Sequence, residues 1–256
     1  MRTTWQGQME NYRRLMHLSD PNHLEAPDRH FIGHRDIITR NLARYRLIEP
    51  YVHGVLADIG CGRGYGIAAL HGRFTSCVGI DISYEFLRDL HAEQPDVPIA
   101  LASGEHLPFT DQSFDTLIAF EVIEHLEDDE GFLRQLRKLL RSDGMLAIST
   151  PNRVIASGTA EHPLNKFHVR EYMPEEFRAL LMRVFDDVTL MGQYDYTLQT
   201  GGTSLADRIP IQWKYQLPIH IQGLLSIMTR APLHLEDCQF TSEELDLTHT
   251  LIAFCR

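Results

Sequence analysis

An acidic residue followed by a glycine-rich segment, DIGCGRG, occupies residues 58–64. Glycines let the backbone turn tightly and approach a ligand that a Cβ atom would exclude. A second acidic residue, Asp81 in GIDIS, can accept hydrogen bonds from both hydroxyls of a ribose. Dinucleotide-binding turns share the glycines, but the Asp58 carboxylate would repel a diphosphate. The motif therefore favours a nucleoside ligand that carries positive charge, such as an ammonium and a sulfonium.

Two carboxylates and an imidazole stand close together in the segment FEVIEHL, as Glu121, Glu124 and His125. If a helical turn begins at Glu121, the three side chains share one face. They repel one another unless a proton or a cation separates them, and a divalent metal would do so. In the alternative, Glu121 contacts cofactor or substrate, and His125 acts as a base or caps a helix.

A later histidine completes the proposed ligand set. His162 and His168 both lie in the polar segment that follows the strand ending at Pro151, and His168 is the stronger choice. Asn152 either orients a ligand or forms a turn after the proline. Three basic residues lie in this part of the chain: Arg153, Lys166 and Arg170. We interpret them as solvated surface charges, and a local basic patch near the site is the alternative.

Short apolar runs alternate with amphipathic segments through the middle of the chain. We expect strands within 54–60, 76–83, 97–103, 114–121, 144–150, 186–193 and 245–256. Helices are expected within 34–49, 65–73, 83–93, 129–143 and 174–185, with Ser83 as an N-cap, Gly144 just past a helix end and Pro174 at a helix start. Strands that alternate with helices predict an α/β fold with a parallel sheet covered on both faces.

The pattern divides the chain into four parts. Residues 1–50 form an N-terminal helical segment, 51–194 the ligand-binding core, 195–240 an inserted lid or substrate region, and 241–256 the final strand of the core sheet. The inserted region is irregular, and Trp213, Tyr215 and the apolar residues from Leu217 to Leu225 could accommodate an aromatic ring or face a membrane.

Composition restricts the partners of the chain. A formal net charge of -11 disfavours broad binding to nucleic acid or to anionic membranes, because affinity for phosphates depends on Lys and Arg. No apolar stretch is long enough for a transmembrane helix, and the first residues lack the apolar run of a secretory signal. The four scattered cysteines fit a reducing compartment and a cytoplasmic protein. The oligomeric state is left open.

Five segments resemble, in order and spacing, the motifs of class I S-adenosylmethionine-dependent methyltransferases: DIGCGRG, GIDIS, EHLPFTDQSFD, FEVIEHL and GMLAISTPN. The resemblance implies a Rossmann-like fold with a mostly parallel seven-stranded sheet and an antiparallel last strand. It implies that S-adenosyl-L-methionine contacts a set of residues: Asp58, Gly60, Cys61, Gly62, Gly64, Asp81, Ile82, Gly104, Glu105 and Phe120. Asp58, Gly60 and Gly62 would surround its methionine part. Many relatives have Asp where Ser103 stands, which weakens the expected contact to the adenine amino group.

The second group resembles two metal-using branches of that family. The ExxEH pattern occurs in methyltransferases that modify the 3′ end of small RNA and in those of ubiquinone synthesis, and His168 matches a later histidine of the RNA enzymes. This resemblance implies Mg²⁺ or Mn²⁺ on Glu121, Glu124, His125 and His168, with His125 or His168 as the catalytic base. The same pattern also resembles methyltransferases of bacterial surface-glycan and natural-product pathways, where a metal-free role is the alternative.

These features together predict a methyltransferase that acts on a hydroxyl of a small molecule, sugar or glycan precursor. RNA ribose methylation and quinone or catechol O-methylation are the alternative reactions. A cofactor-binding partner without catalysis is less favoured, because both DIGCGRG and ExxEH are intact.

Overall fold

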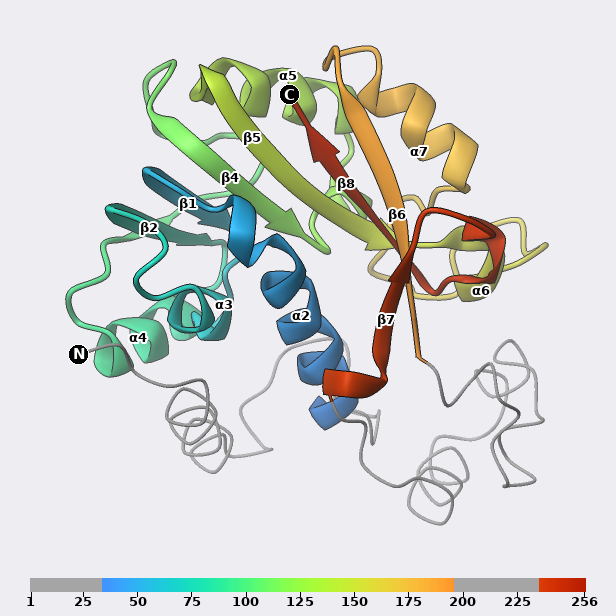
Figure 1. Cartoon of the computed structure of the whole chain (residues 1–256), viewed down its shortest axis with the longest axis horizontal. Coiled ribbons are helices and arrows are strands. Elements are labelled where there is room, and N and C mark those ends of the chain that lie inside the picture. The colour runs from blue at the N-terminus through green and yellow to red at the C-terminus, as the bar shows by residue number, and fades with distance from the viewer. Residues whose placement is uncertain (1–33, 196–234) are drawn as a thin grey trace.

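The computed structural model describes residues 34–195 and 235–256 and arranges them around one mixed sheet (Figure 1). The predicted N-terminal residues up to 33 and the part of the predicted lid at 196–234, including Trp213 and Tyr215, lie outside the described residues. The strand order is β3-β2-β1-β4-β5-β8-β6-β7. The strands are β1 (Val55–Ile59), β2 (Ser76–Asp81), β3 (Ile99–Leu101), β4 (Phe114–Phe120), β5 (Leu140–Pro151), β6 (Val188–Asp195), β7 (Cys238–Thr241) and β8 (Thr250–Cys255).

The described sheet has eight strands where the sequence predicted seven. β8 runs antiparallel to β5, as expected for the last strand, and β6 is antiparallel to β8. The additional strand is β7, which pairs antiparallel with β6 at the sheet edge. Cys238 and Phe240 therefore belong to the sheet, although the sequence assigned them to the inserted region. The segment 245–249, expected as strand, contains the short 3₁₀ helix η5 (Leu245–Leu247).

Helices cover both faces of the sheet, as the alternating pattern predicts. One face carries α2 (His34–Ile48), followed by the short 3₁₀ helix η1 (Glu49–Tyr51), and the helices α3 (Tyr65–Ala69) and α4 (Tyr84–Glu93). The other face carries α5 (Asp129–Leu139) and α7 (Pro174–Leu181). The remaining short elements are η2 (Ile123–His125), α6 (Arg153–Ala156) and η4 (Leu235–Asp237). No described helix has the length and apolar character needed to cross a membrane.

Local signals fix the ends of these helices. The Ser83 side chain accepts a hydrogen bond from the backbone N–H of Phe86, which confirms the predicted N-cap of α4. Pro174 begins α7, where its missing N–H costs no helical hydrogen bond. The predicted end of α5 is wrong, because the helix ends at Leu139 and Gly144 lies inside β5; α3 and α7 also end before the predicted residues 73 and 185, at Ala69 and Leu181. Leu140 is already extended and pairs with Phe114, so the strand takes over residues that the pattern gave to the helix.

The parallel strands place their carboxyl ends at one edge of the sheet. β1, β2, β4 and β5 all end there, and β8 begins there because Thr250 pairs with Pro151. In open α/β sheets this edge is where ligands bind. The fold therefore brings the segments after β1, β2, β4 and β5 to one edge, although they are far apart in the sequence.

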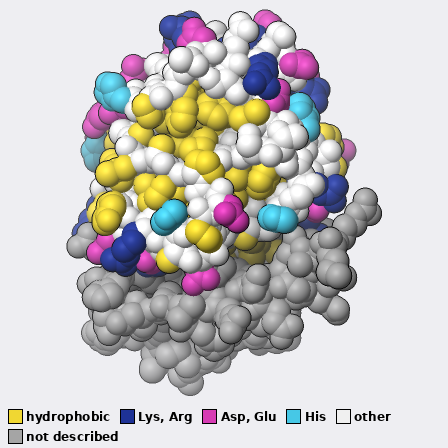
Figure 2. Space-filling model, turned by 90° about the vertical axis from the view of Figure 1, so that its left-hand side faces the viewer, with side chains coloured by type: hydrophobic (Ala, Val, Ile, Leu, Met, Phe, Trp, Pro, Cys, Tyr) yellow, Lys and Arg dark blue, Asp and Glu magenta, His cyan; other side chains and the backbone are white. Residues whose placement is uncertain are grey.

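β3 forms the opposite border of the sheet from β7 and is partly uncovered. Ile99 is 38% exposed and Leu101 59% exposed. Figure 2, which views the left-hand side of Figure 1, shows hydrophobic side chains gathered across the middle of the described surface, with charged side chains and histidines around them.

Candidate active site

The glycine-rich turn after β1 is held open in left-handed backbone conformations. Gly60, Gly62 and Gly64 have φ values of 72°, 54° and 75°, which side chains rarely tolerate. A Cβ atom at Gly62 would meet nothing within 4 Å, so this glycine borders open space. A Cβ at Gly60 would collide with Val122, which follows β4. The turn thus leaves a cradle that a side chain at residue 62 would fill.

Asp58 lies fully buried beneath that turn. The Tyr45 hydroxyl of α2 donates to both of its carboxylate oxygens, at 3.1 and 2.9 Å. Burial raises the pKa of Asp58 to about 7, with a further contribution from the charge of Asp81, while the Tyr45 hydrogen bond opposes the shift. A carboxylate that is costly to ionise in a dry pocket gains most from a cationic ligand.

Asp81 ends β2 and supports the same turn. Its two carboxylate oxygens accept from the backbone N–H groups of Gly62 and Ser83, each at 2.8 Å. Ile82, the next residue, is 76% exposed although it is apolar. Because a carboxylate offers about four acceptor positions, Asp81 keeps capacity for ribose hydroxyls beside an uncovered apolar surface.

The other predicted cofactor residues differ in how far they are exposed to solvent. Cys61 is buried and burial raises the pKa of its thiol, which agrees with a small turn residue rather than a nucleophile. Gly104 accepts from the Gln135 side chain at 2.8 Å through its carbonyl, and Glu105 is exposed. Phe120 is buried and makes an edge contact with the Tyr45 ring. The Ser103 hydroxyl accepts from the backbone N–H of Glu105 at 3.3 Å.

The segment after β4 does not form the helical turn that the sequence suggested. Glu121 adopts a left-handed conformation with φ of 56°, and the 3₁₀ turn begins only at Ile123. Its carboxylate accepts from Arg44 of α2 at 2.9 Å and from the Ser149 hydroxyl at 2.8 Å. Glu121 therefore lies outside the helical turn that holds Glu124 and His125, and the helical face that the three residues were expected to share does not form.

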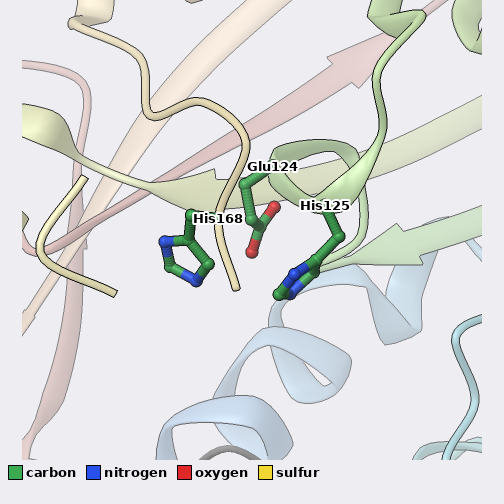
Figure 3. Close-up of side chains that lie close together, drawn as sticks. All are labelled: Glu124, His125 and His168. Carbon is green, nitrogen blue, oxygen red and sulfur yellow. The ribbon is translucent and has the colours of Figure 1, made fainter. Parts of the chain in front are cut away.

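Three of the four predicted metal ligands come together. Ligand atoms of Glu124, His125 and His168 lie within 4.8 Å of one another, and Figure 3 shows the three side chains directed toward a common point. Glu124 and His125 come from η2, and His168 comes from the loop before α7. The backbone N–H groups of Val169 and Arg170 donate to the Glu124 carbonyl at 2.8 and 3.3 Å, which ties the two segments together.

The charge of Glu124 is poorly compensated in this group. The side chain is 1% exposed; one oxygen accepts from Thr150 at 3.2 Å, and Oε1 is buried without a hydrogen-bond partner. Burial, followed by the charge of Glu121, raises the pKa of Glu124 well above its usual value. A buried acceptor without a partner is costly, and a cation at this point would satisfy it.

The hydrogen bonds of the histidines define which nitrogens face the group. Nδ1 of His125 lies 2.9 Å from the Phe167 carbonyl, and Nδ1 of His168 lies 2.8 Å from a Glu171 oxygen. A carbonyl only accepts, so Nδ1 of His125 carries a proton, and Nε2 is the nitrogen through which the neutral imidazole can ligate. Histidines that ligate metals usually make this second contact through their other nitrogen. The donor set therefore fits a divalent cation.

Two candidate residues have other roles in the structure. His162 is exposed and is not a member of the group. Asn152 is fully buried; it caps α6 through Val154 and donates to the carbonyls of Leu245 and Thr248 at 2.9 and 2.7 Å. Both ends of its side-chain amide are thus hydrogen-bonded to the backbone. This agrees with a structural role for Asn152 in the turn after Pro151, not with a role in orienting a ligand.

Sequence reasoning missed the contribution of α2. Its periodicity predicted only a helix leading into the core, yet Arg44 and Tyr45 hold Glu121 and Asp58. Arg40, one turn earlier, pairs with Asp195 at the end of β6 at 2.5 Å. An arginine at 3% exposure is unusual, but no local pattern in the sequence distinguishes Arg44 from the other arginines of the helix.

Known proteins resemble the chain most clearly over its central part. Residues 57–148 match a family model described as a methyltransferase domain. A Mycobacterium tuberculosis protein named as a probable S-adenosylmethionine-dependent methyltransferase is 34% identical over 138 residues, which make up 54% of this chain and 50% of that protein. The ubiquinone biosynthesis O-methyltransferase of Azorhizobium caulinodans is 30% identical over 128 residues, 48% of this chain and 51% of that protein. The chain thus matches about half the length of these relatives.

Solved structures resemble the whole fold at low identity. A SAM-dependent methyltransferase from Archaeoglobus fulgidus has a TM-score of 0.55 at 18% identity and covers 88% of this chain and 96% of its own. The plantazolicin methyltransferase BpumL, solved in complex with SAH, also has a TM-score of 0.55 at 18% identity, with 96% and 98% coverage. These likenesses confirm the expected Rossmann-like class I methyltransferase fold.

Proposed function

We propose that the chain, whose residues 57–148 match a methyltransferase-domain model, is a class I S-adenosylmethionine-dependent methyltransferase that transfers the methyl group of that cofactor to a hydroxyl of a small molecule, sugar or glycan precursor. The observation that carries the choice of a hydroxyl is the group of Glu124, His125 and His168. A hydroxyl is a weak nucleophile until it loses its proton, and this group offers the means to remove it.

The cofactor end of the site is assigned to Asp58, Gly62, Asp81 and Ile82. Gly62 leaves room for a ligand, and the buried Asp58 carboxylate favours positive charge. Asp81 and the exposed Ile82 suit a ribose and the edge of a base. When bound, S-adenosylmethionine supplies the methyl group on a sulfonium, and the protein must hold the acceptor oxygen about 3 Å from it in line.

The acceptor end of the site is assigned to Glu124, His125 and His168. Together they form a set of two imidazoles and one carboxylate. Imidazole ligands favour transition-metal ions, so this set fits Mn²⁺ better than Mg²⁺, which prefers oxygen ligands. Such an ion, when bound, lowers the pKa of a coordinated hydroxyl. In the metal-free alternative, His125 or His168 takes the proton directly. With the metal bound, both histidines would serve as ligands, and the hydroxyl proton would pass to solvent water. In both cases the methyl group moves from sulfur to oxygen, the hydroxyl loses its proton, and a neutral thioether remains.

A methyl-transfer assay on polyols and sugars tests the proposal. We expect activity that falls after treatment with a chelator, returns with Mn²⁺ or Mg²⁺, and is reduced at least tenfold in Glu124→Gln and His168→Gln. His162→Gln, in the same loop but outside the group, serves as the control and should keep full activity. Activity that survives chelation but is lost in His168→Gln would select the metal-free base. Full activity in all variants would refute the assignment of the acceptor end.

RNA ribose methylation and quinone or catechol methylation remain the alternatives. The first has in its favour the match of His168 to the small-RNA enzymes and against it the net charge of -11. The second has in its favour the partial likeness to a ubiquinone biosynthesis O-methyltransferase. Including an RNA 3′ end and a catechol among the acceptors separates these readings.

A further inference from the structure

His168 has a different partner on each ring nitrogen. Nδ1 lies 2.8 Å from Oε1 of Glu171, and Nε2 lies 2.8 Å from Nδ2 of Asn165. All three residues come from one short loop, and its backbone adds a hydrogen bond from the His168 N–H to the Asn165 carbonyl at 3.0 Å. The imidazole is 10% exposed, so these neighbours determine its orientation.

The amide of Asn165 establishes which nitrogen of His168 carries the proton. Its Oδ1 accepts from the backbone N–H of Phe167 at 3.1 Å, which leaves the NH₂ group to face His168. An amide NH₂ only donates, so Nε2 of His168 presents a lone pair and the proton is on Nδ1. That proton is then donated to the Glu171 carboxylate. His125 has the same arrangement through the Phe167 carbonyl.

The Glu171 carboxylate is buried, and His168 is its one hydrogen-bond partner among the described residues. Its side chain is 2% exposed, and its second oxygen, Oε2, is buried without a hydrogen-bond partner. The neighbouring backbone is fixed on both sides, because the Arg170 N–H reaches the Glu124 carbonyl and Tyr172 is fully buried. A buried carboxylate with a single partner is an expensive way to stabilise a loop. This cost points to a task beyond folding.

We propose that Glu171 is a positioning residue that fixes the tautomer and direction of His168, so that the Nε2 lone pair, which Asn165 contacts in the described structure, is the one that can serve the group with Glu124 and His125. The proposal rests on the proposed function, because that lone pair is what would bind a metal or accept a proton. In the described structure the Asn165 amide donates to this lone pair. That hydrogen bond must break before Nε2 can bind a metal or accept a proton. No motif in the sequence marks Glu171 for this role.

The tautomer of His168 gives a test that does not require activity. Long-range ¹H–¹⁵N spectra of metal-free protein distinguish a proton on Nδ1 from one on Nε2. In Asn165→Ala the carboxylate is the remaining partner, and we expect the Nδ1–H form to persist. Adding Glu171→Ala should produce a mixture, whereas adding Glu171→Gln, which can still accept, should retain the Nδ1–H form. A mixture already in Asn165→Ala, or no change on adding Glu171→Ala, would overturn the proposal.

Metal affinity gives the second test, with Mn²⁺ followed by electron paramagnetic resonance. We expect Glu171→Ala to weaken Mn²⁺ binding by about 10- to 100-fold and Glu171→Gln to weaken it less. Glu175→Gln, an exposed carboxylate in the first turn of α7, is the matched control and should bind as the unmodified protein does. Equal affinity in Glu171→Ala would contradict the proposal. If the unmodified protein binds no Mn²⁺, the metal part of the proposed function fails, and the tautomer measurement still decides the role of Glu171.

Discussion

Gly62 and Gly72 allow the cofactor cradle to be tested against a matched residue. Both have positive φ, 54° and 85°, and a Cβ at either would meet nothing within 4 Å. Only Gly62 lies in the turn beneath which Asp58 is buried.

We therefore predict that Gly62→Ala and Gly72→Ala lose similar stability, about 1 kcal/mol each, because alanine is strained in this conformation. Only Gly62→Ala should lose affinity for S-adenosylmethionine, by tenfold or more in calorimetry. Equal cofactor binding by the two variants would place the cofactor elsewhere.

The buried Asp58 carboxylate lowers the stability of the folded protein when it is ionised, and the same charge favours binding of a cationic cofactor. Its pKa is raised from 3.8 to about 7, so the stability it contributes is fully present below pH 4 and is lost as pH rises through 7. Asn cannot ionise, but its oxygen can still accept from Tyr45.

The predicted consequence is that Asp58→Asn makes the cofactor-free protein more stable at pH 8, by up to about 4 kcal/mol at 1.36 kcal/mol per pKa unit. The difference should vanish near pH 4 in denaturant unfolding curves, while affinity for the cationic cofactor falls. A stability difference that does not change with pH would show that Asp58 ionises normally.

At the scale of elements, α2 is attached to the sheet through charge as well as through apolar packing. Arg40 and His249 both contact Asp195, which is 1% exposed. Burial alone would raise the pKa of Asp195, but the His249 hydrogen bond and the Arg40 charge bring it below its usual value. The contacts connect the helix that carries Arg44 and Tyr45 to the ends of β6 and the start of β8.

Arg40→Met should destabilise the protein by about 3 kcal/mol at pH 7, because it leaves the buried Asp195 carboxylate short of a partner. The stabilising effect of a lowered carboxyl pKa is present above about pH 4 and is lost as pH falls through the folded value. The difference between the variant and the original protein should therefore shrink below pH 4. Lys138→Met, at an exposed residue of α5, should change stability by less than about 0.5 kcal/mol.

At the scale of the whole molecule, the charge distribution separates the possible acceptors. The net charge is -11, and the face in Figure 2 shows basic side chains scattered rather than gathered. Several basic residues near the site are already engaged: Arg170 pairs with Asp129 at 3.2 Å, and Arg44 with Glu121.

We predict weak binding of a short single-stranded RNA near physiological salt, with a shallow dependence of log affinity on log salt concentration. Filter binding across a salt series measures both quantities. A steep slope, corresponding to several phosphate contacts, would favour RNA as the acceptor over a small hydroxyl compound.

The sequence alone determined the parts that depend on local backbone geometry. The sequence correctly predicted the glycine turn, the apolar strands, the Ser83 cap and the start of a helix at Pro174. Each of these features depends on constraints within a few residues. The end of α5 was misread because pairing of Leu140 with Phe114 overrode helical propensity.

Only the tertiary structure decided the partners of the site residues. Glu121 lies three residues before Glu124 in the sequence pattern, yet its backbone is left-handed, its carboxylate pairs with Arg44, and it is not a member of the group. The roles of Arg44, Tyr45 and Glu171 depend on the residues that they contact: Glu121, Asp58 and His168. Side-chain partners follow from which elements meet in space, and the spacing of residues along the chain does not encode that meeting.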